Sequence, residues 1–193
     1  MKKRLLSAIL SFCMLLTMAP TVAFAAEDDE GNTAPATSGT CGAEGSADSV
    51  KWNFNSSTGT LKISGTGKMS NLNNSTETEN ISDGAGTYPW ANLKDSITNI
   101  VIADGVTSIG SKAFIAYTNV TSVNIGKDVS EIGVGALSQL SACTTFNVSS
   151  ENSNFTTDAT GALFDHSKTK LIAFPCGSSV EEYAIPATVK VIS

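Results

Sequence analysis

The chain has 193 residues and a formal net charge of −6, with 18 acidic residues against 12 lysines and arginines. This length is enough for one domain with a substantial core, and Arg4 is the only arginine. An acidic chain with a single arginine lacks the positive field and the bidentate donors on which nucleic-acid binding depends, so nucleic acid is excluded as a partner.

The first 25 residues have the organisation of a secretory signal peptide. A basic start (Lys2, Lys3 and Arg4) is followed by an apolar run over 5–18 and by the small-x-small cleavage site Ala-Phe-Ala at 23–25. The run is shorter than the about 20 residues that cross a bilayer, which favours cleavage after residue 25 over an uncleaved anchor. The mature chain then has nine lysines against eighteen acidic residues, a charge of −9. It has no second long apolar segment, so we expect a secreted or cell-surface protein with no transmembrane segment in the mature chain.

Residues 26–40 are acidic and then rich in Gly, Thr, Ala and Pro, which is typical of a flexible leader. Residues 41–96 have a different pattern. Apolar and polar residues alternate in 50–54 and again in 60–64, with five turn-forming residues between them, which predicts a β-hairpin. The polar segment 71–86 predicts a long loop. We therefore interpret 41–96 as a β-hairpin cap module and loop.

Residues 97–142 contain one 23-residue unit twice, as 97–119 and 120–142. Six apolar positions recur at this spacing: Ile97, Ile100, Ile102, Val106, Ile109 and Phe114 return as Val120, Val123, Ile125, Val129, Ile132 and Leu137. Such a period is typical of a solenoid, in which no coil can bury its apolar residues alone and neighbouring coils stack to form one core.

A third unit covers 143–179 and is 37 residues long, 14 more than the others. It begins with the repeat pattern, and its extra residues contain two apolar segments, 162–164 and 171–174, that predict an inserted hairpin. A fourth, incomplete unit covers 180–193, and its match to the first unit places Tyr183 above Phe146.

Together these elements predict a mainly β solenoid with short helical turns, forming a right-handed array of about three and a half coils behind the β-hairpin cap. Because the last coil stops halfway, Ile185, Val189 and Ile192 have a neighbour on one side only. We expect this end to fray or self-associate, and we interpret the sequence as a fragment of a longer protein.

Three cysteines follow the signal peptide: Cys41, Cys143 and Cys176. An odd number cannot all pair within one chain, and three are too few to staple a domain of this size. Cys143 occupies the repeat position of Ile97 and Val120, which predicts a buried core residue.

No catalytic, cofactor-binding or metal-binding residues are expected. Cys176 and the single histidine, His166, are the one pair that could combine as nucleophile and base, but a histidine in a hairpin turn is usually solvated. The acidic residues 27–30 lie in the leader, where a charge run is normally solvated. No spacing matches a calcium loop or a zinc cluster. Gly65-Thr66-Gly67 is not followed by the lysine and serine of a phosphate-binding loop.

The strands of the coils turn a second set of side chains away from the core. The candidate partner-binding residues are Asn99, Val101, Ser122, Asn124, Thr145, Asn147 and Glu182. Stacked, they form two columns on the extended kind of surface that solenoids use for binding. They are mostly small and uncharged, without the Tyr, Trp or Arg anchors that dominate tight interfaces, so a solvated sheet face is the alternative.

The repeat resembles that of the BspA-like leucine-rich-repeat family of bacterial secreted and cell-surface proteins. The family unit is similar to L-x-x-V-x-I-P-x-x-V-T-x-I-G-x-x-A-F, which is matched here from Ile97 to Phe114 with Ala103 in place of the proline. Pro186 fills the proline position in the last coil. Residues 40–69 and the Pro89-Trp90 pair resemble the amino-terminal cap that precedes such repeats in Gram-positive secreted proteins.

The resemblance implies a non-catalytic secreted or cell-surface module that recognises an extracellular protein or glycan, since family members are associated with adhesion to host matrix, cells or surface polymers. An alternative is a targeting or spacer region of a larger secreted hydrolase whose catalytic domain lies beyond Ser193. A structural role in the cell envelope is a third.

Overall fold

The computed structural model describes residues 36–71 and 88–193. The expected signal peptide, nearly all of the expected leader and most of the polar loop lie outside the described residues. The described part is mostly β-strand with little helix, limited to the short 3-10 helices η1 (Ala47–Ser49) and η2 (Ala91–Ser96). Within these residues no helix has the length and hydropathy needed to cross a membrane.

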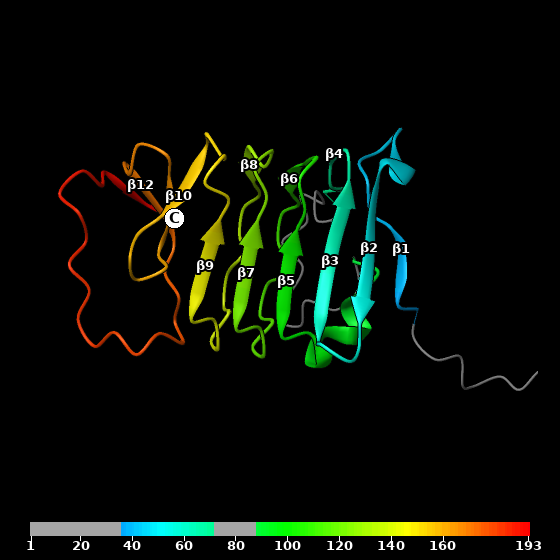
Figure 1. Cartoon of the computed structure of the whole chain (residues 1–193), viewed down its shortest axis with the longest axis horizontal. Coiled ribbons are helices and arrows are strands. Elements are labelled where there is room, and N and C mark those ends of the chain that lie inside the picture. Colours follow the sequence, from blue (N-terminus) through cyan, green and yellow to red (C-terminus); the bar gives the residue numbers. More distant parts are fainter. Residues whose placement is uncertain (1–35, 72–87) are drawn as a thin grey trace, which may run out of the picture. The chain divides into compact units, whose positions relative to one another are not determined.

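The strands of the described residues form three sheets (Figure 1). The largest contains, in spatial order, β1 (Ser38–Thr40), β2 (Val50–Asn55), β3 (Thr60–Gly65), β5 (Asn99–Ile102), β7 (Ser122–Ile125) and β9 (Thr145–Val148). The second contains β4 (Gly67–Lys68), β6 (Val106–Ile109) and β8 (Glu131–Ile132). The third contains β10 (Phe155–Thr157), β11 (Leu163–Asp165), β12 (Lys170–Ala173) and β13 (Val191–Ile192).

β2 and β3 are an antiparallel hairpin whose alternating pattern decides which face is buried. In β2 the apolar residues are buried and the polar residues between them are exposed. The Asn55 side chain shapes the turn by accepting a hydrogen bond from the Ser57 N–H at 3.0 Å. Gly59 ends the turn at a φ of +62°, and a Cβ there would lie 2.4 Å from Thr98 Oγ1. This position therefore requires glycine, because both the backbone angle and the close approach exclude a side chain.

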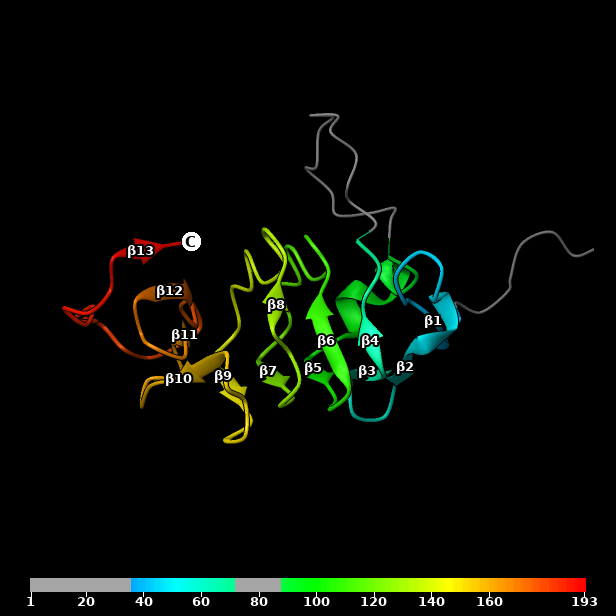
Figure 2. The same ribbon diagram turned by 90° about the horizontal axis from the view of Figure 1, so that it is seen from above.

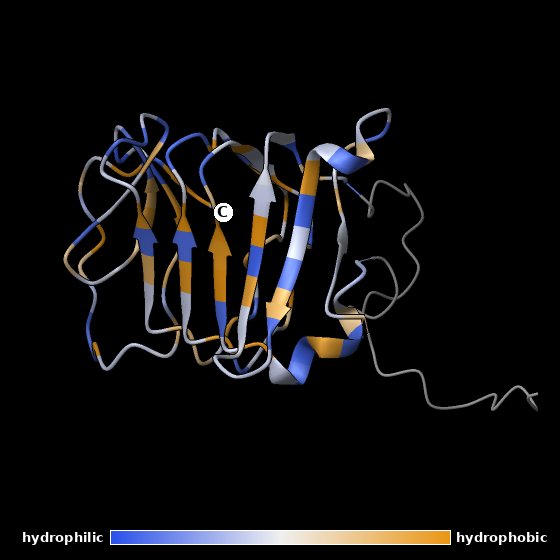
Figure 3. Ribbon diagram, turned by 45° about the vertical axis from the view of Figure 1, so that its right-hand side comes forward, coloured by the Kyte–Doolittle hydropathy of each residue, from blue (hydrophilic) through white to orange (hydrophobic). Residues whose placement is uncertain are grey.

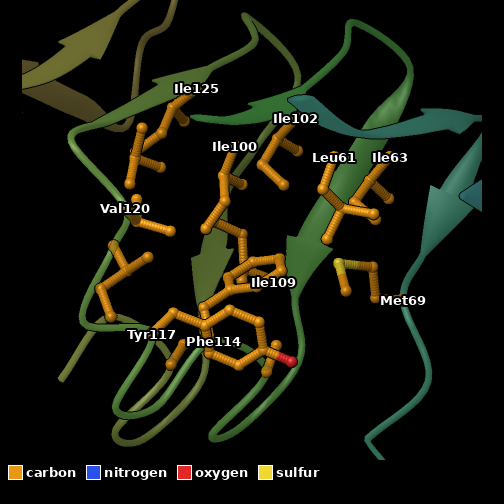
Figure 4. Packing of buried hydrophobic residues seen from close by; sticks show 14 of the residues in the cluster. Leu61, Ile63, Met69, Ile100, Ile102, Ile109, Phe114, Tyr117, Val120 and Ile125 are labelled. Carbon is orange, nitrogen blue, oxygen red and sulfur yellow. The ribbon is translucent and has the colours of Figure 1, made fainter. Parts of the chain in front are cut away.

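β3, β5, β7 and β9 run parallel to one another, and the repeat spacing sets their register. Ile100 pairs with Val123, and Val123 with Phe146, so equivalent residues of three units lie one beside the next. Leu61 of the hairpin pairs with Ile100 in the same way. The hairpin thus continues the sheet of the repeats, and the inward aliphatic residues form one continuous core (Figure 4).

An aromatic cluster fills the core between the hairpin and the first unit. Trp90 is fully buried, and its ring lies 5.0 Å from that of Tyr88, 5.8 Å from Phe114 and 5.9 Å from Trp52. The indole N–H of Trp90 donates to the backbone oxygen of Ala113 at 3.4 Å. The Trp90 side chain therefore connects its own segment to both the hairpin and the first unit.

The third unit leaves the repeat at Asn152, which stands 23 residues after the buried Val129. Asn152 is only 3% exposed, and its Nδ2 donates to the backbone oxygens of Gly126 (2.8 Å) and Val129 (3.0 Å). Its Oδ1 accepts from the N–H groups of Asn154 and Phe155, both at 2.8 Å. A polar residue in a core position is stable because all four bonds are made, and these bonds turn the chain into β10.

The predicted fourth coil does not stack on the third. Residues 174–190, which include Tyr183 and Ile185 of the strand expected beside β9, contain no strand, and β13 pairs in parallel with β12 (Figure 2). The oxygen of Gly161 accepts the N–H of Phe146 at 3.1 Å, so the insert occupies the edge of β9 that the fourth coil was expected to cover. Tyr183 accordingly does not lie above Phe146, and its hydroxyl donates to Asp158 Oδ2 at 2.6 Å. The prediction of about three and a half coils is therefore wrong in its last part, since the fourth coil does not stack on the third.

Amide exchange should be slowest in the core strands and fast after β12. Ile185 is 47% exposed and Ile192 is 64% exposed, so little apolar area holds this segment in place. We expect residues 178–190 to exchange at least about a hundredfold faster than β5 and β7, because opening them disrupts few buried contacts. Hydrogen–deuterium exchange resolved by residue tests this, and equal protection from Ile97 through Ile192 would contradict it.

The turn between β11 and β12 depends on one carboxylate. Asp165 accepts hydrogen bonds from the hydroxyls of Ser167 and Thr169, both at 2.7 Å, and from the Lys170 N–H at 2.6 Å. The bond from Ser167 is the largest cause that lowers the pKa of Asp165 to about 2, from an ordinary value of 3.8. The carboxylate is therefore favoured by the folded state.

Acid should lower the free energy of unfolding by protonating the carboxylate of Asp165. Because the pKa of Asp165 is lower in the folded chain, its contribution is present above about pH 4 and is lost as the pH falls towards 2. Asp165→Asn should be less stable than the wild type at pH 5 and should lose less stability between pH 4 and 2. Urea unfolding at pH 5 and pH 2.5 measures this, with the exposed Asp48→Asn as the control that keeps the wild-type dependence.

Candidate functional site

The outer face of the parallel strands carries two columns of side chains, which we call the sheet face. The first column is Asn99, Ser122 and Thr145, and the second is Val101, Asn124 and Asn147, each residue paired with the next across the strands. Hydrophilic and hydrophobic residues alternate along β7 and β9 (Figure 3), and this alternation turns the side chains of the two columns away from the aliphatic residues of the core. The structure thus brings together six of the seven candidate binding residues.

Glu182 is the exception. It lies in the strandless segment 174–190 and is exposed, with no place in either column. The prediction that Glu182 belongs to the sheet face is wrong for the same reason that the fourth coil does not stack: the insert around Gly161 covers the edge of β9. Asn147 and Thr145 therefore end the two columns.

Hydrogen bonds between neighbouring strands orient the polar groups of the sheet face. Ser122 Oγ donates to Asn99 Oδ1 at 2.9 Å, and Asn147 Nδ2 donates to Asn124 Oδ1 at 3.2 Å. The Nδ2 group of Asn124 has no acceptor within the described residues. The surface therefore offers fixed amide and hydroxyl groups, of which some remain available to a ligand.

A shallow hollow of about 450 Å³ lies over the second column, towards the ends of the strands. Its polar lining residues are Lys62, Asp104, Asn124, Asn147 and Ser149. The sequence did not indicate Lys62, because it belongs to the hairpin and has no counterpart at the repeat spacing. It joins the column only because β3 pairs with β5 and places Lys62 beside Val101.

Carboxylates of successive units hold the loops beside this hollow. Asp104 accepts the N–H of Lys127 at 2.9 Å, and Asp128 accepts that of Gly105 at 2.8 Å. The ammonium group of Lys127 lies 3.3 Å from Glu151, and this hydrogen bond is the main cause that raises the pKa of Lys127. Such exposed pairs contribute little stability, so their role here is to fix loop geometry.

The cysteine thiols and the histidine lie in separate environments. Burial raises the pKa of Cys41 to about 12 and that of Cys143 to about 11, so both stay protonated at neutral pH. Cys176 is exposed and lies in a groove whose lining does not include His166. Among the described residues, no three His, Cys, Asp or Glu side chains are placed to hold a metal ion.

Comparison with known proteins identifies the repeats. The family model of the BspA type leucine rich repeat region matches in six copies, over residues 64–162 and 84–193. No curated protein matches.

Three solved structures are similar. A leucine-rich repeat protein from Eubacterium ventriosum ATCC 27560 has 21% identity and a TM-score of 0.39, over 81% of this chain and 56% of that one. The pneumococcal vaccine antigen PcpA has 19% identity and a TM-score of 0.42, over 50% of this chain and 30% of that one. A leucine rich cell surface protein from Faecalibacterium prausnitzii A2-165 has 14% identity and a TM-score of 0.24, over 75% and 70%. The chain thus spans little more than half the length of the first of these proteins and less than a third of the second.

Proposed function

The chain belongs to the BspA type of leucine-rich repeat proteins, and on that premise we propose that it is a non-catalytic binding module that recognises an extracellular protein or glycan through the sheet face. Repeat regions of this type are typically non-catalytic. The observation that carries the proposal is the alignment of Asn99, Ser122, Asn124 and Asn147 into ordered polar columns on a continuous sheet.

The chemistry of the sheet face suits a polar ligand. Asn and Ser side chains both donate and accept hydrogen bonds, so they match hydroxyls, amides and backbone groups. Lys62 and Asp104 add one charge of each sign at the hollow. The absence of Tyr, Trp and Arg from the two columns points to weak contacts, made effective by repetition along the surface.

We also propose that the repeats form a right-handed solenoid and that the protein is exported. The parallel pairing of β3, β5, β7 and β9 supports a right-handed solenoid of two regular units and an interrupted third. The basic and apolar start of the sequence, with its small-x-small site, supports removal of residues 1–25 and a place outside the cell, as a secreted or cell-surface adhesion protein.

A binding screen tests the function. The chain should bind at least one member of a panel of matrix proteins and cell-wall glycans. Asn124→Ala with Asn147→Ala should weaken that binding about tenfold or more, since each lost interfacial hydrogen bond is worth about 1 kcal/mol.

The matched control is Asn154→Ala, which removes an exposed asparagine away from the sheet face. It should leave the affinity unchanged. Failure of every ligand on the panel would contradict the proposal and favour the alternative that this region is a spacer in a larger secreted hydrolase. Equal loss in the control would show that the sheet face is not the site.

A further inference from the structure

The turns that follow β6 and β8 are joined by a ladder of backbone hydrogen bonds. In the first unit the N–H groups of Lys112, Phe114 and Ala116 donate to the oxygens of Val134, Ala136 and Ser138, each at 3.0 Å. Donors and acceptors are both at alternate residues. All the donors of one turn therefore face the next unit, and all its acceptors face the preceding one.

The second unit has the equivalent donors, but the described part of the third unit supplies no acceptors for them. The residues 23 positions on are Gly135, Leu137 and Gln139, and their N–H groups have no acceptor within the described residues. Their local conformation is the same, since φ is +56° at Lys112 and +67° at Gly135. The three donors therefore point away from the first unit, into the space where the third unit has its insert instead of a turn.

That space is a groove of about 490 Å³. One wall is the turn of the second unit, with Val134, which is 82% exposed. The other wall comes from β12 and the residues after it, with Ile172 and Phe174. The groove is therefore apolar at its sides and has a row of backbone donors along one wall.

The spacing of the three N–H donors and the charge of the groove indicate which ligand fits it. Three donors spread over five residues do not converge on one point, so they suit a linear ligand better than a single small anion. In the first ladder the acceptors belong to a turn over 134–138, so a peptide segment that takes up the same turn would present its alternate oxygens to the three donors, and apolar side chains match the walls. Lys170 is the one charged side chain of the lining and makes no ion pair within the described residues, which favours an acidic ligand.

We propose that this groove binds an acidic, partly apolar peptide segment of a partner protein, whose alternate backbone oxygens accept hydrogen bonds from Gly135, Leu137 and Gln139. The site is separate from the sheet face and does not depend on the function proposed for it. The proposal is supported by the first unit of the same chain, in which the three equivalent N–H groups donate to backbone oxygens.

The chain itself supplies a probe. A synthetic peptide with the sequence of residues 131–141 carries the three oxygens that occupy the equivalent donors, together with the acidic Glu131. Titrated into the isotope-labelled full chain, it should shift the amide resonances of Gly135, Leu137 and Gln139. It should also slow the alkylation of Cys176, measured at that residue by mass spectrometry, because this exposed thiol lines the groove.

Two surface variants make the test specific. Lys170→Glu should weaken the peptide roughly fivefold or more, as expected for loss of an exposed ion pair and its replacement by repulsion. Lys51→Glu, an exposed lysine on β2, is the matched control and should have no effect. Both side chains are exposed, so both variants should fold.

Several results would overturn the proposal. They are no shift at the three amides, equal binding of a scrambled peptide, or equal affinity in Lys170→Glu. Shifts produced by soluble cell-wall glycan fragments but not by the peptide would assign the groove to a sugar and would equally refute a peptide site. None of these outcomes bears on the Asn124 and Asn147 variants, so the two proposals fail separately.

Discussion

A Trp90→Ala variant should unfold with a free energy about 4 kcal/mol lower than the wild type, the range found when large buried aromatic side chains are truncated. Trp90 is fully buried and packs against three other aromatic rings, from the hairpin, the first repeat and its own segment. Its loss leaves a cavity at the junction of these elements and also removes the ring pairing, which is worth about 1 kcal/mol per pair. Domains of this size are stable by about 5–15 kcal/mol, so this loss would remove roughly a quarter to four-fifths of the stability.

Urea unfolding followed by circular dichroism measures the effect. Trp90→Phe is the informative companion, because it keeps an aromatic ring but cannot donate to the oxygen of Ala113, and it should cost about half as much. Val134→Ala, at an exposed position, should change stability by less than about 0.5 kcal/mol. A loss below about 1.5 kcal/mol in Trp90→Ala would mean that the hairpin and the repeats do not share one core.

Asn152→Ala should lower the free energy of unfolding by about 3 kcal/mol, because hydrogen bonds are lost and not because side-chain volume is removed. The substitution leaves the buried N–H of Phe155 and the part-buried N–H of Asn154 without the oxygen that binds both, and a buried donor left in this way costs about 1–3 kcal/mol. Asn152→Asp should be worse still, because a carboxylate would face the oxygens of Gly126 and Val129.

The control is Asn154→Ala, the same substitution two residues later. Asn154 is exposed, and within the described residues its side chain makes one long bond, 3.5 Å, to the oxygen of Val129. It should lose less than about 1 kcal/mol. Equal stability losses for the two alanine variants, read from thermal and urea unfolding, would contradict the assignment of Asn152 as the residue that ends the repeat.

The regular part of the fold could be read from the sequence because it depends on local periodicity. Ile100, Val123 and Phe146 are spaced 23 residues apart, and a sheet of equivalent strands satisfies that spacing at every step. The same alternation places Asn99, Ser122 and Asn124 on the opposite face. The sheet face follows from this pattern as directly as the core does.

The departures could not be read in the same way, because they depend on contacts between residues far apart in the sequence. Asn152 occupies a repeat position usually held by an aliphatic residue, and only its four hydrogen bonds show why a polar side chain is stable there. Tyr183 matches the repeat well, yet its hydroxyl binds Asp158. Periodicity alone cannot tell which of two segments will cover the edge of β9.

The sequence by itself determined the hairpin, the 23-residue unit, the aliphatic core and the outward polar columns, since each follows from the side-chain period of a strand and from the need of every unit to share its core. Only the tertiary structure decided what happens at the third unit. There, the insert closes the edge of β9, leaves three backbone donors of the second unit facing a groove, and excludes Glu182 from the sheet face. The physical reason is competition for one strand edge, where the N–H of Phe146 donates to the oxygen of Gly161 in the insert and Gly161 lies close to Thr145.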